Sequence, residues 1–281
     1  MNFKKNIKNM PAEVLIRLLI WIGLPTIIYP IIFIIITSFK QTDEFYINIW
    51  GLPESCHFEN YLTALTGGRI GEAFLNSLIV TISSVFLLVL FSALSGYALA
   101  KLRIPGAELI IIFLLATCML PVEMIVIPEY IMASRLHITG TYLGLILTYV
   151  GWSQAMAIYI FRSFFLSIPT EMLESGRIDG AGEFHIFYRL VLPLVKPAVV
   201  TNAILGFVSV WGELYWAIIS LSNQSKLRTI PYTIIEFQGQ FGTDWGPFSA
   251  AICIIVLPLV IFFLFTQKYF IAGLTSGAIK G

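Results

Sequence analysis

Glu213 is a carboxylate inside a long apolar run, and aromatic residues surround it in the sequence. Trp211, Tyr215 and Trp216 flank it, and Asn76 opens a second apolar run. A carboxylate accepts hydrogen bonds from hydroxyl groups, and aromatic rings pack against C–H faces. These residues are therefore candidates for binding a hydroxyl-rich solute. The alternative is structural: Glu213 is hydrogen-bonded to a neighbouring helix or a partner subunit, and Asn76 joins two helices.

Motifs for catalysis are absent from the sequence. It contains no G-x-x-x-x-G-K-[ST] loop for nucleotide phosphates and no G-x-S-x-G elbow. Its three histidines are scattered, and its three cysteines form no C-x-x-C pair. We therefore expect no metal site, no disulfide and no cofactor bound by this chain. The sequence predicts a protein that is not an enzyme, so any chemical energy must come from another polypeptide.

The composition is that of a membrane domain. The 281 residues are 58% hydrophobic and 12% charged, whereas soluble domains carry about 25% charged residues. Too little polar surface remains to face water, so most of the surface must face lipid. The net charge of +1 gives no indication of nucleic-acid binding.

Six apolar stretches are long enough to cross a hydrocarbon core of about 30 Å. They predict an all-α polytopic protein with spans at Leu18–Phe39, Phe74–Ala100, Leu109–Ile131, Tyr142–Phe165, Ala198–Leu221 and Phe248–Phe270. The domain prediction is a cytoplasmic N-terminus at 1–17, a first transmembrane helix at 18–39, an extracytoplasmic loop at 40–73, a five-helix core at 74–270 and a cytoplasmic tail at 271–281.

The distribution of positive charge predicts the orientation. Most of the 17 Lys and Arg residues fall on the side that holds both termini and the segment 167–197. Cytoplasmic loops carry an excess of such residues, so both termini are predicted in the cytoplasm. On the opposite side, Phe58–Leu65 is expected to form a short interfacial helix before the second span.

The segment 167–197 predicts a helix–turn–helix knob. Thr170 is expected to cap a helix that begins at Glu171. Gly176 costs about 1 kcal/mol inside a helix, which suggests that another group approaches closely there. Asp179-Gly180 is a turn signal, because glycine adopts positive φ without strain.

A second helix is expected after the turn. Phe184, Phe187 and Leu190 would form one stripe on it, and the helix would end before Pro193. From local features alone, the alternative is an ordinary amphipathic loop that packs on its own helix ends.

The same segment resembles the EAA motif of permeases in binding-protein-dependent ABC importers. Glu174, Gly180, Leu192 and Pro193 stand at the spacing of that motif, while Ser175 and Gly176 replace its two alanines and Leu190 replaces an isoleucine. Other stretches resemble the carbohydrate-uptake branch, similar to the second permease of maltose-type importers. They include Ser95–Lys101, Met119–Pro121 and the C-terminal stretch Tyr269–Gly281.

The resemblance implies a type I ABC importer permease fold and a bacterial inner-membrane location. It also implies a second permease as heterodimer partner, two ATPase subunits that hold ATP and Mg, an extracytoplasmic solute-binding protein and a sugar substrate. It makes segment 167–197, here called the coupling loop, the contact with the ATPase. The residues to which it assigns that contact are Glu171, Glu174, Ser175, Gly176, Asp179, Gly180, Ala181, Phe184 and Pro193.

The resemblance also implies that the part of span five around Glu213 lines the translocation path. A phosphate-bearing solute would favour Lys or Arg there, and the middle of each predicted span has none. A neutral sugar is therefore favoured over glycerol phosphate or an amino acid. A gradient-driven carrier or a membrane enzyme acting alone is the alternative of a different class.

Overall fold

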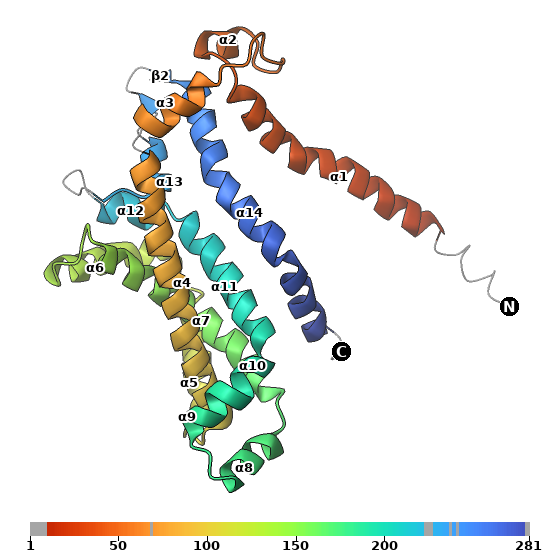
Figure 1. Cartoon of the computed structure of the whole chain (residues 1–281), viewed down its shortest axis with the longest axis vertical. Helices are drawn as coiled ribbons and strands as arrows, with labels where there is room; N and C mark the ends of the chain where they lie inside the picture. Colours follow the sequence, from red (N-terminus) through yellow and green to blue (C-terminus); the bar gives the residue numbers. More distant parts are fainter. Residues whose placement is uncertain (1–9, 68–69, 222–226, 236–237, 240–241, 279–281) are drawn as a thin grey trace. The chain divides into compact units, whose positions relative to one another are not determined.

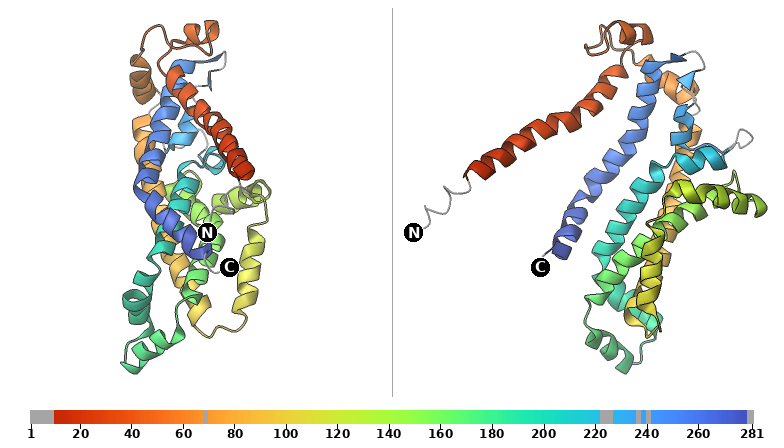
Figure 2. Two further views of the ribbon diagram at one scale, coloured as in Figure 1. Left: turned by 90° about the vertical axis from the view of Figure 1, so that its right-hand side faces the viewer. Right: turned by 180° about the vertical axis from the view of Figure 1, so that it is seen from behind.

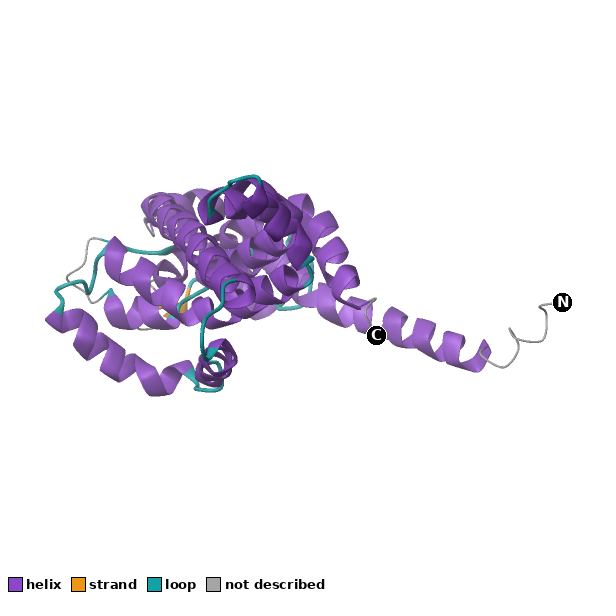
Figure 3. Ribbon diagram, turned by 90° about the horizontal axis from the view of Figure 1, so that it is seen from below, coloured by secondary structure: helices purple, strands orange, loops and turns teal. Residues whose placement is uncertain are grey.

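The computed structural model describes residues 10–67, 70–221, 227–235, 238–239 and 242–278, and nearly all of them are helical (Figure 3). The chain forms two compact units, Met1–Ile70 with Ile234–Val256 and Gly71–Thr233 with Leu257–Gly281. The all-α prediction is confirmed. The exception within the described part is one short antiparallel pair, β1 (Gln238–Gly239) and β2 (Gly242–Thr243).

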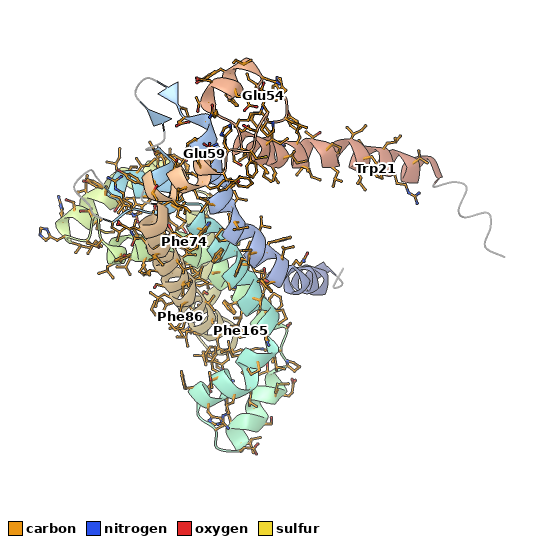
Figure 4. All side chains as sticks on the ribbon, turned by 45° about the horizontal axis from the view of Figure 1, so that its top comes forward. Trp21, Glu54, Glu59, Phe74, Phe86 and Phe165 are labelled. Atoms are coloured by element: carbon orange, nitrogen blue, oxygen red, sulfur yellow. The ribbon has the colours of Figure 1, made fainter. Side chains whose placement is uncertain are left out.

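The first unit contains the first membrane helix and the loop that the sequence predicts to be extracytoplasmic. Its helices are α1 (Met10–Thr37), α2 (Thr42–Ile47), α3 (Glu59–Gly67) and the beginning of α14 (Trp245–Ala278). The predicted helix at Phe58–Leu65 corresponds to α3. In α1, an 18-residue stretch within Arg17–Thr37 has no buried residue, and Trp21 is 73% exposed (Figure 4). Most of this helix therefore exposes apolar side chains that lipid or a partner subunit can cover.

A buried lysine organises the segment between α1 and α3 in this unit. Lys40 is fully buried, and its Nζ donates to the carbonyl oxygens of Asn48 at 2.6 Å and Ile49 at 3.3 Å. The Nδ2 of Asn60 donates to the carbonyl oxygen of Lys40 at 2.8 Å. Carbonyl oxygens just after a helix favour a positive charge, so Lys40 holds the end of α2 against the end of α1.

The second unit contains the remaining elements and the rest of α14. They are α4 (Ile70–Lys101), α5 (Ala107–Thr117), α6 (Val122–Arg135), α7 (Tyr142–Leu166), α8 (Thr170–Ile178), α9 (Glu183–His185), the π-helical η1 (Ile186–Val191), α10 (Leu192–Leu194), α11 (Lys196–Trp211), α12 (Tyr215–Ser220) and α13 (Ile230–Ile234). In this unit α4, α7 and α11 run side by side, with α8 at one end and α6 and α12 at the other (Figures 1 and 2).

Two of the predicted spans are broken. Among the described residues, four helices are long and apolar enough to cross a membrane. The number rises to as many as six if each bent pair of helices counts as one span. The predicted span Leu109–Ile131 is not one helix, because α5 ends at Thr117 and α6 leaves at an angle of 98°. Pro121 causes the break, since it has no N–H and holds extended backbone with ψ of 137°.

The predicted span Ala198–Leu221 is also interrupted. Helix α11 ends at Trp211, and α12 begins only at Tyr215. Glu213 lies in this interruption. By contrast, α14 is longer than predicted, because the expected tail at 271–281 continues the helix as far as Ala278, and residues 279–281 lie outside the described part.

A glycine allows α4 and α7 to touch through their backbones. A Cβ added at Gly96 of α4 would lie 2.8 Å from the Cβ of Phe161 and 3.1 Å from the backbone nitrogen of Arg162, both on α7. The first distance is shorter than real Cβ contacts, and the second is shorter than most of them. The crossing therefore depends on the absence of a side chain at this position.

Candidate functional site

The coupling loop begins with α8, and this helix starts one residue earlier than predicted. Thr170 is the first helical residue rather than the cap, and no side-chain cap is formed. Pro169 precedes it in extended backbone, with ψ of 137°, and fixes the start. Because proline occupies the cap position and has no side-chain acceptor, the capping role predicted for Thr170 is wrong.

The predicted turn at Asp179-Gly180 is confirmed. Gly180 has φ of +80°, the left-handed region that favours glycine. Its N–H donates to the carbonyl of Arg177 at 3.0 Å, and the N–H of Ala181 donates to the carbonyl of Gly176 at 3.0 Å. This pair of bonds is the Schellman arrangement, which ends a helix and satisfies two of its last carbonyls.

The close approach expected at Gly176 occurs within the loop itself. Gly176 is buried, and a Cβ there would lie 3.0 Å from Leu190 Cδ1 and 3.3 Å from Ile186 Cγ1. The small residue thus lets the second half of the loop pack onto α8. Its neighbour Ser175 is exposed, and its hydroxyl donates to the carbonyl of Met172 at 2.9 Å.

The second half of the loop is not the regular helix predicted. Residues 186–191 form the π-helix η1, in which hydrogen bonds join residues five apart. Ile186 and Val191 consequently share one fully buried face. The stripe expected from Phe184 and Phe187 is split, because Phe187 is 6% exposed and Phe184 is 73% exposed.

Pro193 does not end the second helix, contrary to prediction. The helix continues through α10 to Leu194 before the bend of 78° into α11. Because η1 ends at Val191, Pro193 falls in the first turn of α10. The backbone N–H groups of a first turn have no acceptor within the helix, so the missing N–H of proline costs no hydrogen bond there.

An apolar core fixes the coupling loop to two membrane helices. Phe187 packs against Tyr97 of α4, with ring centroids 5.2 Å apart, and against Phe165 of α7 at 6.4 Å. Phe165 is fully buried and is labelled in Figure 4. The buried residues of this core are Ala93, Tyr97, Phe161, Phe165, Ile168, Leu173, Ile186, Phe187, Val191, Val195 and Ala198.

Polar contacts at the edge of this core join the same elements. The hydroxyl of Tyr97 donates to Glu183 Oε2 at 3.1 Å, and Arg177 Nε donates to Glu183 Oε1 at 2.6 Å. The bond from Arg177 lowers the pKa of the Glu183 carboxyl. The pair is thus fully formed at neutral pH, and its contribution is lost only as the pH falls through that lowered value. Lys101 Nζ, at the end of α4, donates to the carbonyl of Ile168 at 2.5 Å.

Tyr97 is a functional candidate that the sequence did not reveal, and its hydroxyl can be tested. Tyr97→Phe keeps the ring in the core but removes the bond to Glu183. Because that carboxylate is partly exposed, we expect a loss of about 1 kcal/mol or less in stability. The measured quantity is the thermal unfolding midpoint in detergent, which should fall slightly. The control is Tyr159→Phe, an exposed tyrosine of α7, whose midpoint should match that of the wild type.

The surface left outside this core carries both charged and large apolar side chains. Glu171, Glu174 and Asp179 are exposed, and Ala181 is partly exposed. Ile178 is 86% exposed, Phe184 73% and Tyr188 61%. Large apolar side chains exposed together on a loop end are typical of a protein contact.

Glu213 is held by this chain in the manner of a helix cap. Its Oε1 accepts from the backbone N–H of Trp216 at 2.9 Å, and its Oε2 accepts from the hydroxyl of Tyr149 at 2.8 Å. The carboxylate thereby satisfies the first free amides of α12, so the chain can interrupt span five. This geometry favours the structural alternative for Glu213.

The other residues proposed for the translocation path differ in how exposed they are and in the bonds they make. Trp211 and Trp216 are 1% and 0% exposed, so neither presents a free ring face, whereas Tyr215 is 45% exposed. Asn76 joins elements of its own chain: its Nδ2 donates to the carbonyl of Arg228 at 2.9 Å, and its Oδ1 accepts from the hydroxyl of Tyr142 at 2.6 Å.

The capping role of Glu213 gives a stability prediction. Glu213→Ala removes the acceptors at the start of α12, and losing a cap costs about 1 kcal/mol. Glu213→Gln retains one acceptor oxygen and should lose less. The measurement is the thermal unfolding midpoint in detergent, with the exposed Glu123→Ala as control. Equal midpoints for Glu213→Ala and the control would contradict the capping role.

Comparisons with known proteins agree with this geometry. The family model of the binding-protein-dependent transport system inner membrane component matches residues 60–276. A probable ABC transporter permease protein of Bacillus subtilis, YurM, is 35% identical over 96% of this chain and 89% of its own length. The arabinooligosaccharides transport system permease protein AraQ of Bacillus subtilis is 32% identical over 90% of this chain and 91% of its own length.

A solved structure shares the fold. A chain of a bacterial ABC transporter involved in the import of the acidic polysaccharide alginate aligns with a TM-score of 0.80 and 23% identity, over 94% of this chain and 98% of that one. The expected type I permease fold is thus confirmed. Since the family model spans most of the sequence, this chain belongs to the inner-membrane permease components of binding-protein-dependent ABC transport systems.

Proposed function

We propose that this chain forms half of the translocation path of an ATP-driven importer for neutral oligosaccharides. The observation that carries the transport role is the coupling loop, which exposes an apolar end and is locked by its core to α4 and α7. The sugar class is supported by relatives such as AraQ, whose name refers to arabinooligosaccharides. Other candidate solutes are glycerol phosphate and amino acids.

The partners follow from what the chain lacks. Its sequence has no nucleotide-binding motif, so ATP and Mg are held by two separate ATPase subunits. A second, non-identical permease completes the path, and an extracytoplasmic solute-binding protein delivers the sugar. The excess of Lys and Arg on one side supports a cytoplasmic position for both termini and for the coupling loop.

Coupling works by transmitting a displacement through a packed core. When ATP draws the ATPase subunits together, the exposed surface of Glu171, Glu174 and Phe184 moves with them. Because Phe187 packs against both Tyr97 and Phe165, that motion reaches the ends of α4 and α7 together. ATP binds the two states with different affinity, and this difference drives the change of access.

The test begins with the assembly itself. The tagged chain is purified from its own membranes in a mild detergent, and we expect an ATPase polypeptide and a second permease to co-purify. The assembly is then placed in vesicles with its solute-binding protein and offered labelled arabinotriose, raffinose or maltotriose. We expect ATP-dependent uptake of at least one of these sugars.

Other outcomes would change the conclusion in defined ways. ATP-dependent uptake of glycerol phosphate or an amino acid, with no uptake of any sugar, would overturn the substrate class and retain the importer. Uptake by the single chain in ATP-free vesicles, driven by an ion gradient, would overturn the importer and establish a carrier.

A further inference from the structure

A shallow cavity, largely open to the surface of the second unit, combines a carboxylate with an indole ring. It has a volume of about 310 Å³ and is lined by Ile125, Pro128, Glu129 and Met132 of α6 and by Trp152 of α7. Binding pockets for small molecules measure about 300–1,000 Å³. The cavity is therefore of the size that suits one sugar ring.

The polar groups in this cavity are fixed in place. Glu129 Oε2 accepts from Trp152 Nε1 at 2.9 Å. The Trp152 ring packs edge-on against Trp216 at 6.1 Å and against Tyr149 at 6.2 Å. Glu129 Oε1 makes no hydrogen bond to any described residue. An ordered carboxylate with one oxygen available, next to a partly exposed indole ring, is a preorganised acceptor for a hydroxyl group.

The position of the cavity connects it to both broken spans. Helix α6 is the part of span three that follows the break at Pro121, and α12, which carries Trp216, is the part of span five that follows the break at Glu213. Irregular backbone at membrane depth is tolerated where it is buried in protein or lines a water-filled cavity. Interrupted helices recur where transporters bind their substrates.

The charge of the cavity selects among sugars. Among the described residues, Glu129 forms no ion pair, and the lining has no Lys or Arg. A buried or half-buried carboxylate without a cation repels a second anion. A neutral sugar that donates hydroxyl groups fits this site, and a uronic acid does not.

We propose that Glu129 and Trp152 form a subsite for one neutral sugar ring on this permease, with Glu129 excluding acidic sugars. The inference rests on the proposed function. Glu129 accepts a ring hydroxyl through its free oxygen, and Trp152 packs against a C–H face of the sugar. The subsite differs from the group around Glu213, whose carboxylate is already used as a cap.

Binding is measured on the purified assembly without its solute-binding protein. Equilibrium dialysis gives the Kd of whichever labelled neutral sugar the wild type imports (arabinotriose, raffinose or maltotriose) and of trigalacturonate as the acidic probe. For Glu129→Gln and Trp152→Phe we expect the Kd of the neutral sugar to rise about tenfold, the value of one hydrogen bond to a charged group. Glu129→Gln should also lower the ratio of the Kd of trigalacturonate to the Kd of the neutral sugar.

Two further variants complete the design. Met132→Trp fills the cavity without touching the bond between Glu129 and Trp152, and it should weaken binding as well. Glu123→Gln removes an exposed carboxylate from the same helix, outside the lining, and should leave the Kd unchanged. Its ATPase activity in the absence of sugar should also match that of the wild type.

The outcomes are separable. If the wild type imports a neutral sugar but Glu129→Gln, Trp152→Phe and Met132→Trp bind it like Glu123→Gln, the subsite is wrong and the proposed function stands. If these variants instead lose the second permease on purification, the cavity is a subunit contact and the subsite is overturned. If the wild type imports no sugar of the panel, the proposed function itself fails.

Discussion

Replacing Gly180 with valine is expected to uncouple transport from ATP hydrolysis while the chain still assembles in the membrane. Gly180 has φ of +80°, and nothing lies within 4 Å of a Cβ added there. The effect is therefore backbone strain rather than a clash. Left-handed backbone costs an ordinary residue about 1–2 kcal/mol, which lowers the population of the native turn about five- to thirtyfold.

The measurement is ATPase stimulation by the sugar-loaded binding protein, together with uptake. Gly180→Asn should recover most of the activity, since asparagine tolerates left-handed backbone. Gly182→Val is the matched control, because Gly182 lies in the same loop with φ of −69° and has open space around its Cβ position. Normal stimulation in Gly180→Val would show that the turn does not transmit the ATPase motion.

Replacing Gly96 with valine is expected to destabilise the second unit more than any other single change discussed. The new side chain would meet the Phe161 Cβ at 2.8 Å and the backbone of α7 at 3.1 Å. Because backbone cannot rotate away, α4 and α7 must separate, and overpacking of this kind costs about 1–3 kcal/mol. The loss should appear as a lower thermal midpoint in detergent and as reduced yield of the assembly.

The control for Gly96 is a glycine in the facing helix. Gly151 lies in α7, is exposed, and has nothing within 4 Å of a Cβ position. Gly151→Val places the same residue in a helix of similar length without a clash, so its midpoint should match the wild type. If both variants unfold at one temperature, the contact of α4 with α7 does not limit the stability of this unit.

The sequence was sufficient for the features that depend on local composition. Hydropathy located the membrane segments, and the Asp179-Gly180 pair gave the turn, because one residue type satisfies positive φ far better than the others. The spacing from Glu174 to Pro193 indicated the family. Each of these signals can be read within a window of about 20 residues.

The features that were missed depend on distant partners. Span five looks continuous because its apolar residues run past Glu213, and the Tyr149 hydroxyl that donates to this carboxylate is 64 residues away in the chain. Tyr97 and Glu183 are 86 residues apart in the chain, so nothing local joins them. Likewise, the bond between Glu129 and Trp152 joins residues 23 apart in the chain, and it forms only because α6 turns by 98° from α5.

The length of the π-helical segment η1 determines how the two ends of the coupling loop are rotated relative to each other about the helix axis. It stands between α8, which faces outward, and α11, which continues into the membrane. Each residue of an α-helix turns the chain by about 100°, so deleting one residue from η1 would swing Ile186 or Val191 out of the core. A substitution changes the contacts of one residue, whereas a deletion rotates every residue on one side of it relative to those on the other side. The number of residues in this segment is consequently a stricter requirement than the identity of most of them.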